Sequence, residues 1–108
     1  MISVTHFRAS EADFAVRAQQ ALTVLAARPG FLRGSLGRST DDDADWVLVT
    51  EWRNVGSYRR ALGNYEVKLH ATPLLGEAVD LPSSFEALAE VSSDGELRVQ
   101  TSDREPES

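Results

Sequence analysis

The chain has 108 residues, 42% of them hydrophobic, and its formal net charge at pH 7 is −6. This length suits one domain with its own core, and the charge argues against nucleic-acid or anionic-membrane binding, which needs a basic face. Without cysteine there are no disulfides or thiolate sites, no stretch reaches the roughly 18–20 apolar residues of a membrane span, and the lack of a basic-then-apolar leader predicts a cytoplasmic protein.

The first two elements are a strand and a helix. Apolar and polar residues alternate over 2–8, which is typical of a strand. Ser10 is the expected N-cap of a helix over about 11–27, with Asp13 as its capping-box partner, and Pro29-Gly30 ends the helix. The residues expected on the buried stripe of this helix are Phe14, Ala18, Leu22 and Leu25, with Ala21 beside them.

A hairpin follows the helix. Residues 31–39 read as the second strand, where Gly34 and Gly37 indicate a bulge or a close approach by other atoms. The turn over 40–44 is polar and rich in aspartate, but it lacks the central glycine and the final glutamate of a calcium-binding loop. We therefore expect a solvated turn and no metal site.

The third strand covers Asp45 to Trp52 and is apolar at most positions on both faces. A strand of this kind must be covered on both sides. We expect helices on one side and a second sheet or a second chain on the other.

The next segment predicts a helix that begins after Arg53-Asn54. Its apolar face is expected to carry Tyr58, Leu62, Tyr65 and Leu69, with a break at Gly63-Asn64. His70 lies near its end, shortly before Pro73.

The C-terminal part predicts a fourth strand over 84–91, a turn, and a short extra strand within 96–101. Residues 102–108 contain no apolar side chain and are expected to be disordered. These patterns divide the chain into a domain over 1–91 and an extension over 92–108.

The resulting order, β-α-β-β-α-β, is that of the ferredoxin-like α+β fold, with a four-stranded antiparallel sheet. Right-handed crossovers place both helices on the same face of the sheet. The other face is apolar and uncovered, so periodicity alone predicts pairing with a second copy.

A family resemblance rests on a few short segments. Glu51-Trp52 at a strand end, Tyr58 on the following helix, the run His70-Ala71-Thr72-Pro73 and the earlier turn over 27–31 resemble the antibiotic biosynthesis monooxygenase family over about residues 1–91. The resemblance implies a homodimer of the dimeric α+β barrel type. It also implies a cofactor-independent monooxygenase in which a small aromatic or quinol-like substrate donates an electron to O₂ directly.

Such an enzyme needs a base and hydrogen-bond donors around an apolar cavity. By residue type, the resemblance implies His70 as the base, with Trp52, Asn64 and Tyr65 lining the cavity between the sheet and the helices. His6, Tyr58 and Arg53 are expected to line the substrate pocket. The alternative for Trp52 and Tyr58 is packing of sheet against helix, and for the histidines a surface or interface position.

Two other functions remain open at this point. Haem-degrading relatives carry an axial histidine on this helix, but they also have an asparagine on the first strand and a tryptophan on the preceding helix. This chain has Thr5 and His6 on the first strand and no such tryptophan, which disfavours haem. A non-catalytic dimeric module that binds a small molecule is the other alternative.

Overall fold

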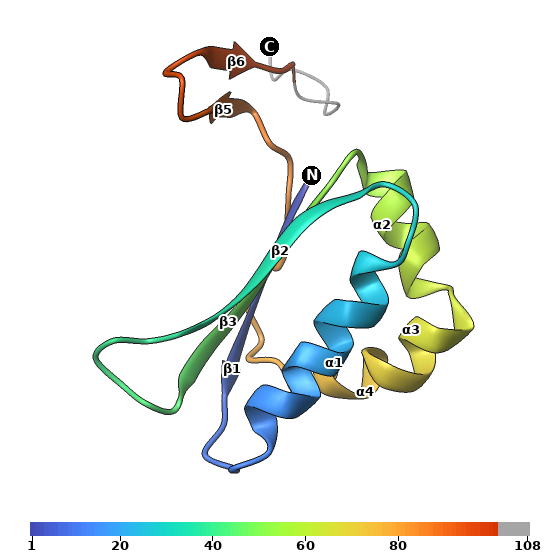
Figure 1. Cartoon of the computed structure of the whole chain (residues 1–108), viewed down its shortest axis with the longest axis vertical. Helices are drawn as coiled ribbons and strands as arrows, with labels where there is room; N and C mark the ends of the chain where they lie inside the picture. Colours follow the sequence, from blue (N-terminus) through green and yellow to red (C-terminus); the bar gives the residue numbers. More distant parts are fainter. Residues whose placement is uncertain (102–108) are drawn as a thin grey trace.

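The protein folds as an α+β sandwich with helices on one face of a four-stranded sheet (Figure 1). This computed structural model describes residues 1–101, so the disorder expected over 102–108 lies outside the described part. The elements are β1 Ile2–Arg8, α1 Phe14–Ala26, β2 Phe31–Arg38, β3 Asp45–Trp52, α2 Val55–Leu62, α3 Tyr65–His70, α4 Thr72–Leu75, β4 Ser84–Phe85, β5 Ala89–Val91 and β6 Leu97–Val99.

The main sheet has the order β2-β3-β1-β4, and its described pairs are all antiparallel. This arrangement confirms the ferredoxin-like prediction, because β1 and β2 lie parallel with β3 inserted between them. The strand bounds expected for the first three strands agree with the structure to within a residue. The three long strands therefore form a rigid frame on which the helices pack.

The two faces of the sheet differ in environment. Ser3, Thr5 and Phe7 of β1 are buried beneath the helices, together with alternate residues of β3. The opposite face carries Val4 paired with Val49, and both side chains are only partly buried. In the single chain, as predicted, helices cover one face of the sheet and leave the other face uncovered.

The register of β2 against β3 shifts between Phe31 and Arg33, just before the two glycines at which a bulge was expected. Gly34 has the other expected role, which is to permit a close approach by other atoms. A Cβ on Gly34 would lie 2.6 Å from Leu22 Cδ1 of α1 and 3.2 Å from the Val49 carbonyl oxygen. The missing side chain therefore allows α1 to approach the sheet closely.

Helix α1 starts later than expected. The predicted capping box at Ser10 is wrong, because the N-cap is Asp13 and its side chain makes no capping hydrogen bond. Residues before Phe14 form a turn instead, with the Phe14 amide donating to the Glu11 carbonyl at 3.2 Å. The buried stripe agrees with the prediction: Phe14, Ala18, Ala21 and Leu25 are buried, and Leu22 packs beside them.

The second helical segment breaks at Gly63-Asn64, as predicted; Tyr58 and Leu62 before the break pack against the core as expected, but the residues expected after it do not. Tyr65 is 71% exposed and Leu69 51% exposed, whereas Val67 is fully buried. The break restarts the helix at the Asn64 N-cap, so the periodicity read across it does not continue. The core instead receives the smaller side chains Ala61, Val67, Ala71 and Leu74.

The fourth strand is much shorter than the predicted 84–91. Only Ser84 and Phe85 join the main sheet, where they pair with β1. The chain then leaves the sheet, and β5 pairs with β6 as a separate two-stranded hairpin that projects from the body (Figure 1). Alanine and glutamate favour strands weakly, and Gly95 at φ 82° supplies a local turn that competes for this segment. The boundary expected at residue 91 consequently falls inside the hairpin.

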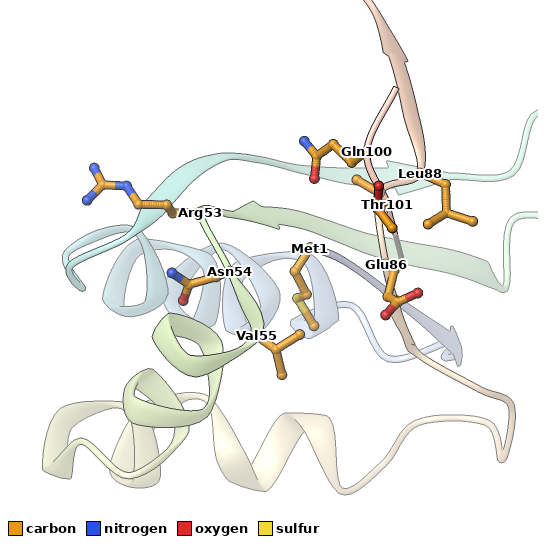
Figure 2. Close-up of a pocket in the computed structure, with 9 residues that line it drawn as sticks. Met1, Arg53, Asn54, Val55, Glu86, Leu88, Gln100 and Thr101 are labelled. Carbon is orange, nitrogen blue, oxygen red and sulfur yellow. The ribbon is translucent and has the colours of Figure 1, made fainter. Parts of the chain in front are cut away.

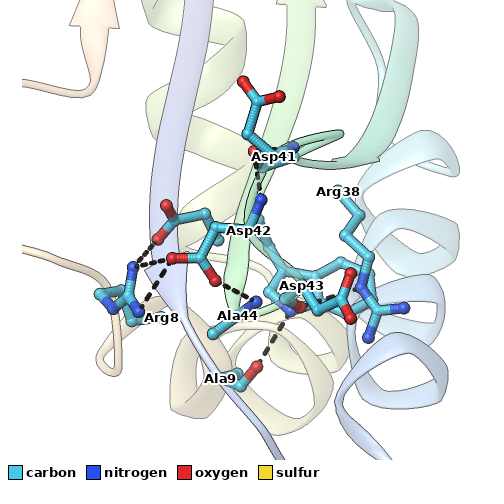
Figure 3. A network of polar contacts seen from close by, with 10 residues as sticks. Arg8, Ala9, Arg38, Asp41, Asp42, Asp43 and Ala44 are labelled. Carbon is cyan, nitrogen blue, oxygen red and sulfur yellow. Dashed lines mark hydrogen bonds and ion pairs between the residues drawn. The ribbon is translucent and has the colours of Figure 1, made fainter.

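The aspartate-rich turn before β3 is held by two arginines, Arg8 and Arg38, of which Arg38 donates to the Asp43 carbonyl at 3.0 Å (Figure 3). Arg8 of β1 contacts Asp45 and, at 3.3 Å, an Oδ2 of Asp42. The other carboxylate oxygen of Asp42 accepts a hydrogen bond from the Ala44 amide at 2.9 Å. That backbone bond and then Arg8 lower the pKa of Asp42 below its ordinary value.

We predict that Asp42→Asn destabilises the protein at pH 7 and does not at about pH 2. A carboxyl whose pKa is lower in the folded state stabilises that state above its unfolded pKa, near 3.8, and loses this effect as the pH falls through the folded pKa. Urea unfolding midpoints of both proteins at the two pH values measure it. A difference that persists unchanged in acid would contradict the role of the charge.

Candidate functional site

A small hollow lies where the N-terminus, the β3–α2 junction and the base of the hairpin meet (Figure 2). Its volume is about 110 Å³. The sheet and the α2 start contribute Met1, Arg53, Asn54 and Val55; the C-terminal segment contributes Glu86, Ala87, Leu88, Gln100 and Thr101. We refer to it as the junction hollow.

The body side of the junction hollow is fixed by backbone hydrogen bonds. The Met1 ammonium donates to the Trp52 carbonyl at 3.0 Å, and the Trp52 amide donates to the Met1 carbonyl at 2.8 Å. The next amide, that of Arg53, donates to the Gly30 carbonyl at 2.8 Å. The chain therefore leaves β3 in one defined direction and presents Arg53 and Asn54 at the end of the sheet.

Asn54 has a second task at this position. It is the N-cap of α2, and its Oδ1 accepts from the Ser57 amide at 2.8 Å and from the Ser57 hydroxyl at 2.9 Å. Asparagine is favoured here because its side-chain oxygen satisfies a free amide of the first turn. With the oxygen used in this way, the side-chain NH₂ is left as a donor.

The lining combines apolar surface with donors and one carboxylate. Met1 and Val55 supply apolar atoms, and Arg53 and Asn54 supply N–H donors. Glu86 is the carboxylate among the lining residues of the described chain. By residue type such a set can stabilise an oxyanion and accept a proton; in Figure 2 the Arg53 guanidinium extends away from Met1 and Glu86.

The structure does not bring the four predicted catalytic residues to this hollow. Trp52 is 1% exposed, and its Nε1 donates to Thr50 Oγ1 at 2.8 Å. Its ring packs against Phe31 at 5.2 Å and against Tyr58 at 5.5 Å between centroids. Trp52 and Tyr58 thus pack sheet against helix, which was the alternative reading for both.

The other three lie on α3 or at its start. Asn64 caps α3 by accepting from the Glu66 and Val67 amides, and Tyr65 points largely into solvent. His70 Nδ1 lies 3.2 Å from Gln20 Nε2, and His70 Nε2 lies 3.5 Å from Glu66 Oε2. Catalytic roles for these residues stay predictions, and their contacts are those of structural residues.

Among the predicted pocket residues, Arg53 lines the junction hollow, whereas His6 does not. His6 is exposed on the uncovered face of the sheet, opposite Val47, and lines a different hollow of about 260 Å³ near the β2–β3 turn. His70 belongs to the helical layer (Figure 1). The two histidines therefore lie on opposite sides of the sheet, and a shared pocket for them is not formed within one chain.

Asn54, Glu86 and Gln100 were missed by the sequence reading. A capping signal for Asn54 was present, because an asparagine between a strand and a helical pattern is a typical N-cap. Glu86 and Gln100 come together only because β5 leaves the main sheet, and no local pattern encodes that departure.

The comparisons with known proteins bear on the family. The sequence model described as antibiotic biosynthesis monooxygenase matches residues 1–71 of the chain. The chain belongs to that family. The comparison with curated proteins gave no match.

Solved structures support the same fold. SnoaB, a cofactor-independent oxygenase from Streptomyces nogalater, is 24% identical, with 96% of this chain and 93% of that chain covered and a TM-score of 0.64. A conserved protein from Methanosarcina mazei Go1 is 15% identical, with 77% and 84% covered and a TM-score of 0.62. At these identities the likeness shows the fold.

The contacts of His70 are with protein side chains: Nδ1 lies beside Gln20 Nε2, and Nε2 forms an ion pair with Glu66 only when the histidine is protonated. Over residues 1–101, no group of three or more His, Asp or Glu side chains is arranged to hold a metal ion. No helix in the same range has the length and hydropathy to span a membrane, and the cytoplasmic location stays a prediction.

We predict that Trp52→Ala lowers the free energy of unfolding by about 3–5 kcal/mol, because it removes a fully buried ring from the core. Tyr65→Ala is the matched control and should change it by no more than about 0.5 kcal/mol, since the Tyr65 side chain is largely solvated. Urea denaturation followed by fluorescence or circular dichroism measures both. Equal losses would mean that Tyr65 is buried in solution.

Proposed function

We propose that this protein is a cofactor-independent monooxygenase that acts on a small aromatic or quinol-like substrate at the junction hollow. The observation that carries the proposal is the meeting of Arg53 and Asn54 donors with apolar atoms at a defined strand end, in a member of the antibiotic biosynthesis monooxygenase family. The fold it shares with SnoaB, a cofactor-independent oxygenase, supports it further.

In the proposed reaction the substrate supplies all of the electrons. Glu86 accepts a proton from the substrate, and the Arg53 and Asn54 N–H groups stabilise the resulting phenolate or enolate oxygen. The anion transfers one electron to O₂, and the two radicals combine to form a C–O bond. Protonation gives a hydroperoxide; loss of water from it leaves a carbonyl on the substrate carbon. A CH₂ group and O₂ thereby become C=O and H₂O, without an external reductant.

The volume of the hollow favours a second candidate as well. About 110 Å³ is less than the roughly 300 Å³ of typical ligand sites, so a ring enters fully only if the hairpin base moves away from Met1. A non-catalytic dimeric module that binds a small molecule would need no such opening. The two candidates differ in O₂ consumption.

The test is O₂ uptake with a panel of hydroquinones and anthrones, in buffer with chelator and without flavin. We expect turnover, and we expect Arg53→Gln and Asn54→Asp each to lower kcat/KM by roughly 10–100-fold. Asn54→Asp is informative because aspartate keeps the capping oxygen while removing the NH₂ donor. Arg59→Gln on the exposed side of α2 is the control.

Substrate binding without O₂ uptake would favour the binding module. If O₂ uptake occurs and neither variant changes it, the reaction takes place elsewhere on the chain and the assigned site is wrong.

We also propose that the protein works as a homodimer joined through the uncovered sheet face and the hairpin. Val4 and Val49 lie on that face with partial exposure. On the hairpin, Val91, Leu97 and Val99 are 63%, 60% and 73% exposed. An isolated two-stranded hairpin is at best marginally stable in water, and apolar surface of this extent is typical of an interface.

We predict a sedimentation mass of twice 11.8 kDa for the native chain and a shift toward the monomer in Val49→Lys. A lysine in the centre of the interface would place an unpaired charge in apolar surroundings. Val16→Lys is the control, because Val16 is 65% exposed on α1 of the covered side. A native monomer would overturn the proposed assembly.

A further inference from the structure

Only some of the arginines in this acidic protein form ion pairs with carboxylates. Arg8, Arg17 and Arg33 each form an ion pair with a carboxylate. Within residues 1–101, Arg28 and Arg60 have no ion pair, a property they share with Arg38, Arg53, Arg59, Lys68 and Arg98. Arg28 follows the end of α1, and Arg60 lies in the last turn of α2.

Arg28 and Arg60 line the same cavity. Its volume is about 120 Å³, and its remaining walls are Pro29, Ser57 and Ala61. It is separate from the junction hollow, whose lining shares no residue with it. We call it the arginine cleft.

The position of the Arg60 guanidinium is set by contacts. Arg60 belongs to the last turn of α2, yet its Nη2 donates to the Ser57 hydroxyl at 3.4 Å. Its Nη1 lies over the first turn, 3.2 Å from where a Cβ on Gly56 would be. Side chains on a helix point back toward its N-terminus, so this reach is natural. The first turn of α2 carries no acidic residue to neutralise it.

The opposite wall is brought close by a glycine. Gly30 follows Arg28-Pro29 at φ 88°, and a Cβ there would lie 2.3 Å from Ser57 Oγ. Only glycine accepts both this backbone angle and this approach. The turn after α1 therefore packs directly on α2, which holds Arg28 and Arg60 on two sides of one cavity. Ser57 itself is 5% exposed and fixed by Asn54.

We propose that the arginine cleft binds a small oxyanion, a carboxylate or a phosphate group. Guanidinium groups present paired N–H donors that match the oxygens of both groups. The cavity of about 120 Å³ has room for one oxyanion group.

The inference does not depend on the proposed oxygenase activity. The cleft and the junction hollow share no lining residue, and their side-chain donors are different. Binding there is measured by spectroscopy on the protein alone.

The experiment is a titration with sodium phosphate and, separately, with sodium acetate at constant ionic strength, followed by backbone amide NMR. We expect saturable shifts of the Gly30 and Ser57 amides with a dissociation constant in the millimolar range. Arg60→Gln and Arg28→Gln should each weaken binding roughly tenfold. Comparison of the two anions identifies whether phosphate or carboxylate is preferred.

Two controls make the result specific. Arg59→Gln removes the neighbouring charge on α2, which does not line the cleft, and should leave the dissociation constant within about twofold of the native value. Arg60→Lys keeps the charge and tests the forked donor geometry; it should bind more weakly than native and more tightly than Arg60→Gln. The proposal is overturned if neither anion gives saturable shifts, or if Arg59→Gln weakens binding as much as Arg60→Gln.

Discussion

The architecture depends on a strand that is apolar on both faces. In β3, Leu48 and Trp52 enter the core beneath the helices, while Val47 and Val49 face the other way. The helices can cover only one side, because both crossovers of a split β-α-β unit have the same hand. Burial of one side defines the fold, and the other side is left as a partly exposed apolar surface.

The junction of β3 with α2 shows how a fold of this kind makes a site. Trp52 is held between Phe31 and Tyr58, so the strand end has no freedom to shift. Asn54 then caps the helix with its side-chain oxygen, and its side-chain amide NH₂ remains available as a donor. Arg53, between them, has neither task. A packing residue, an exposed guanidinium and a capping residue thus follow one another in the chain, and the packing and the cap fix the backbone on both sides of Arg53.

The sequence predicted the layers of this fold better than it predicted the site. Hydrophobic alternation located the first three strands, and glycine and asparagine located the helix break at residues 63–64. The buried face of α3 was misassigned, because the spacing of apolar residues was read across the break at Gly63-Asn64; after the restart Val67 is buried and Tyr65 is exposed. Residue type likewise favoured Trp52 as a reactive group, although its size and position make it a core residue.

The family match ends at residue 71, whereas more than half of the residues around the junction hollow lie beyond residue 85. The two walls of the hollow thus come from segments under different constraints. The body wall must preserve the sheet and its caps, whereas of the C-terminal wall only Ala87 is buried. The shape of the hollow can consequently diverge, or be redesigned, through the exposed residues of the C-terminal segment while the four-stranded sheet and its helices are left untouched.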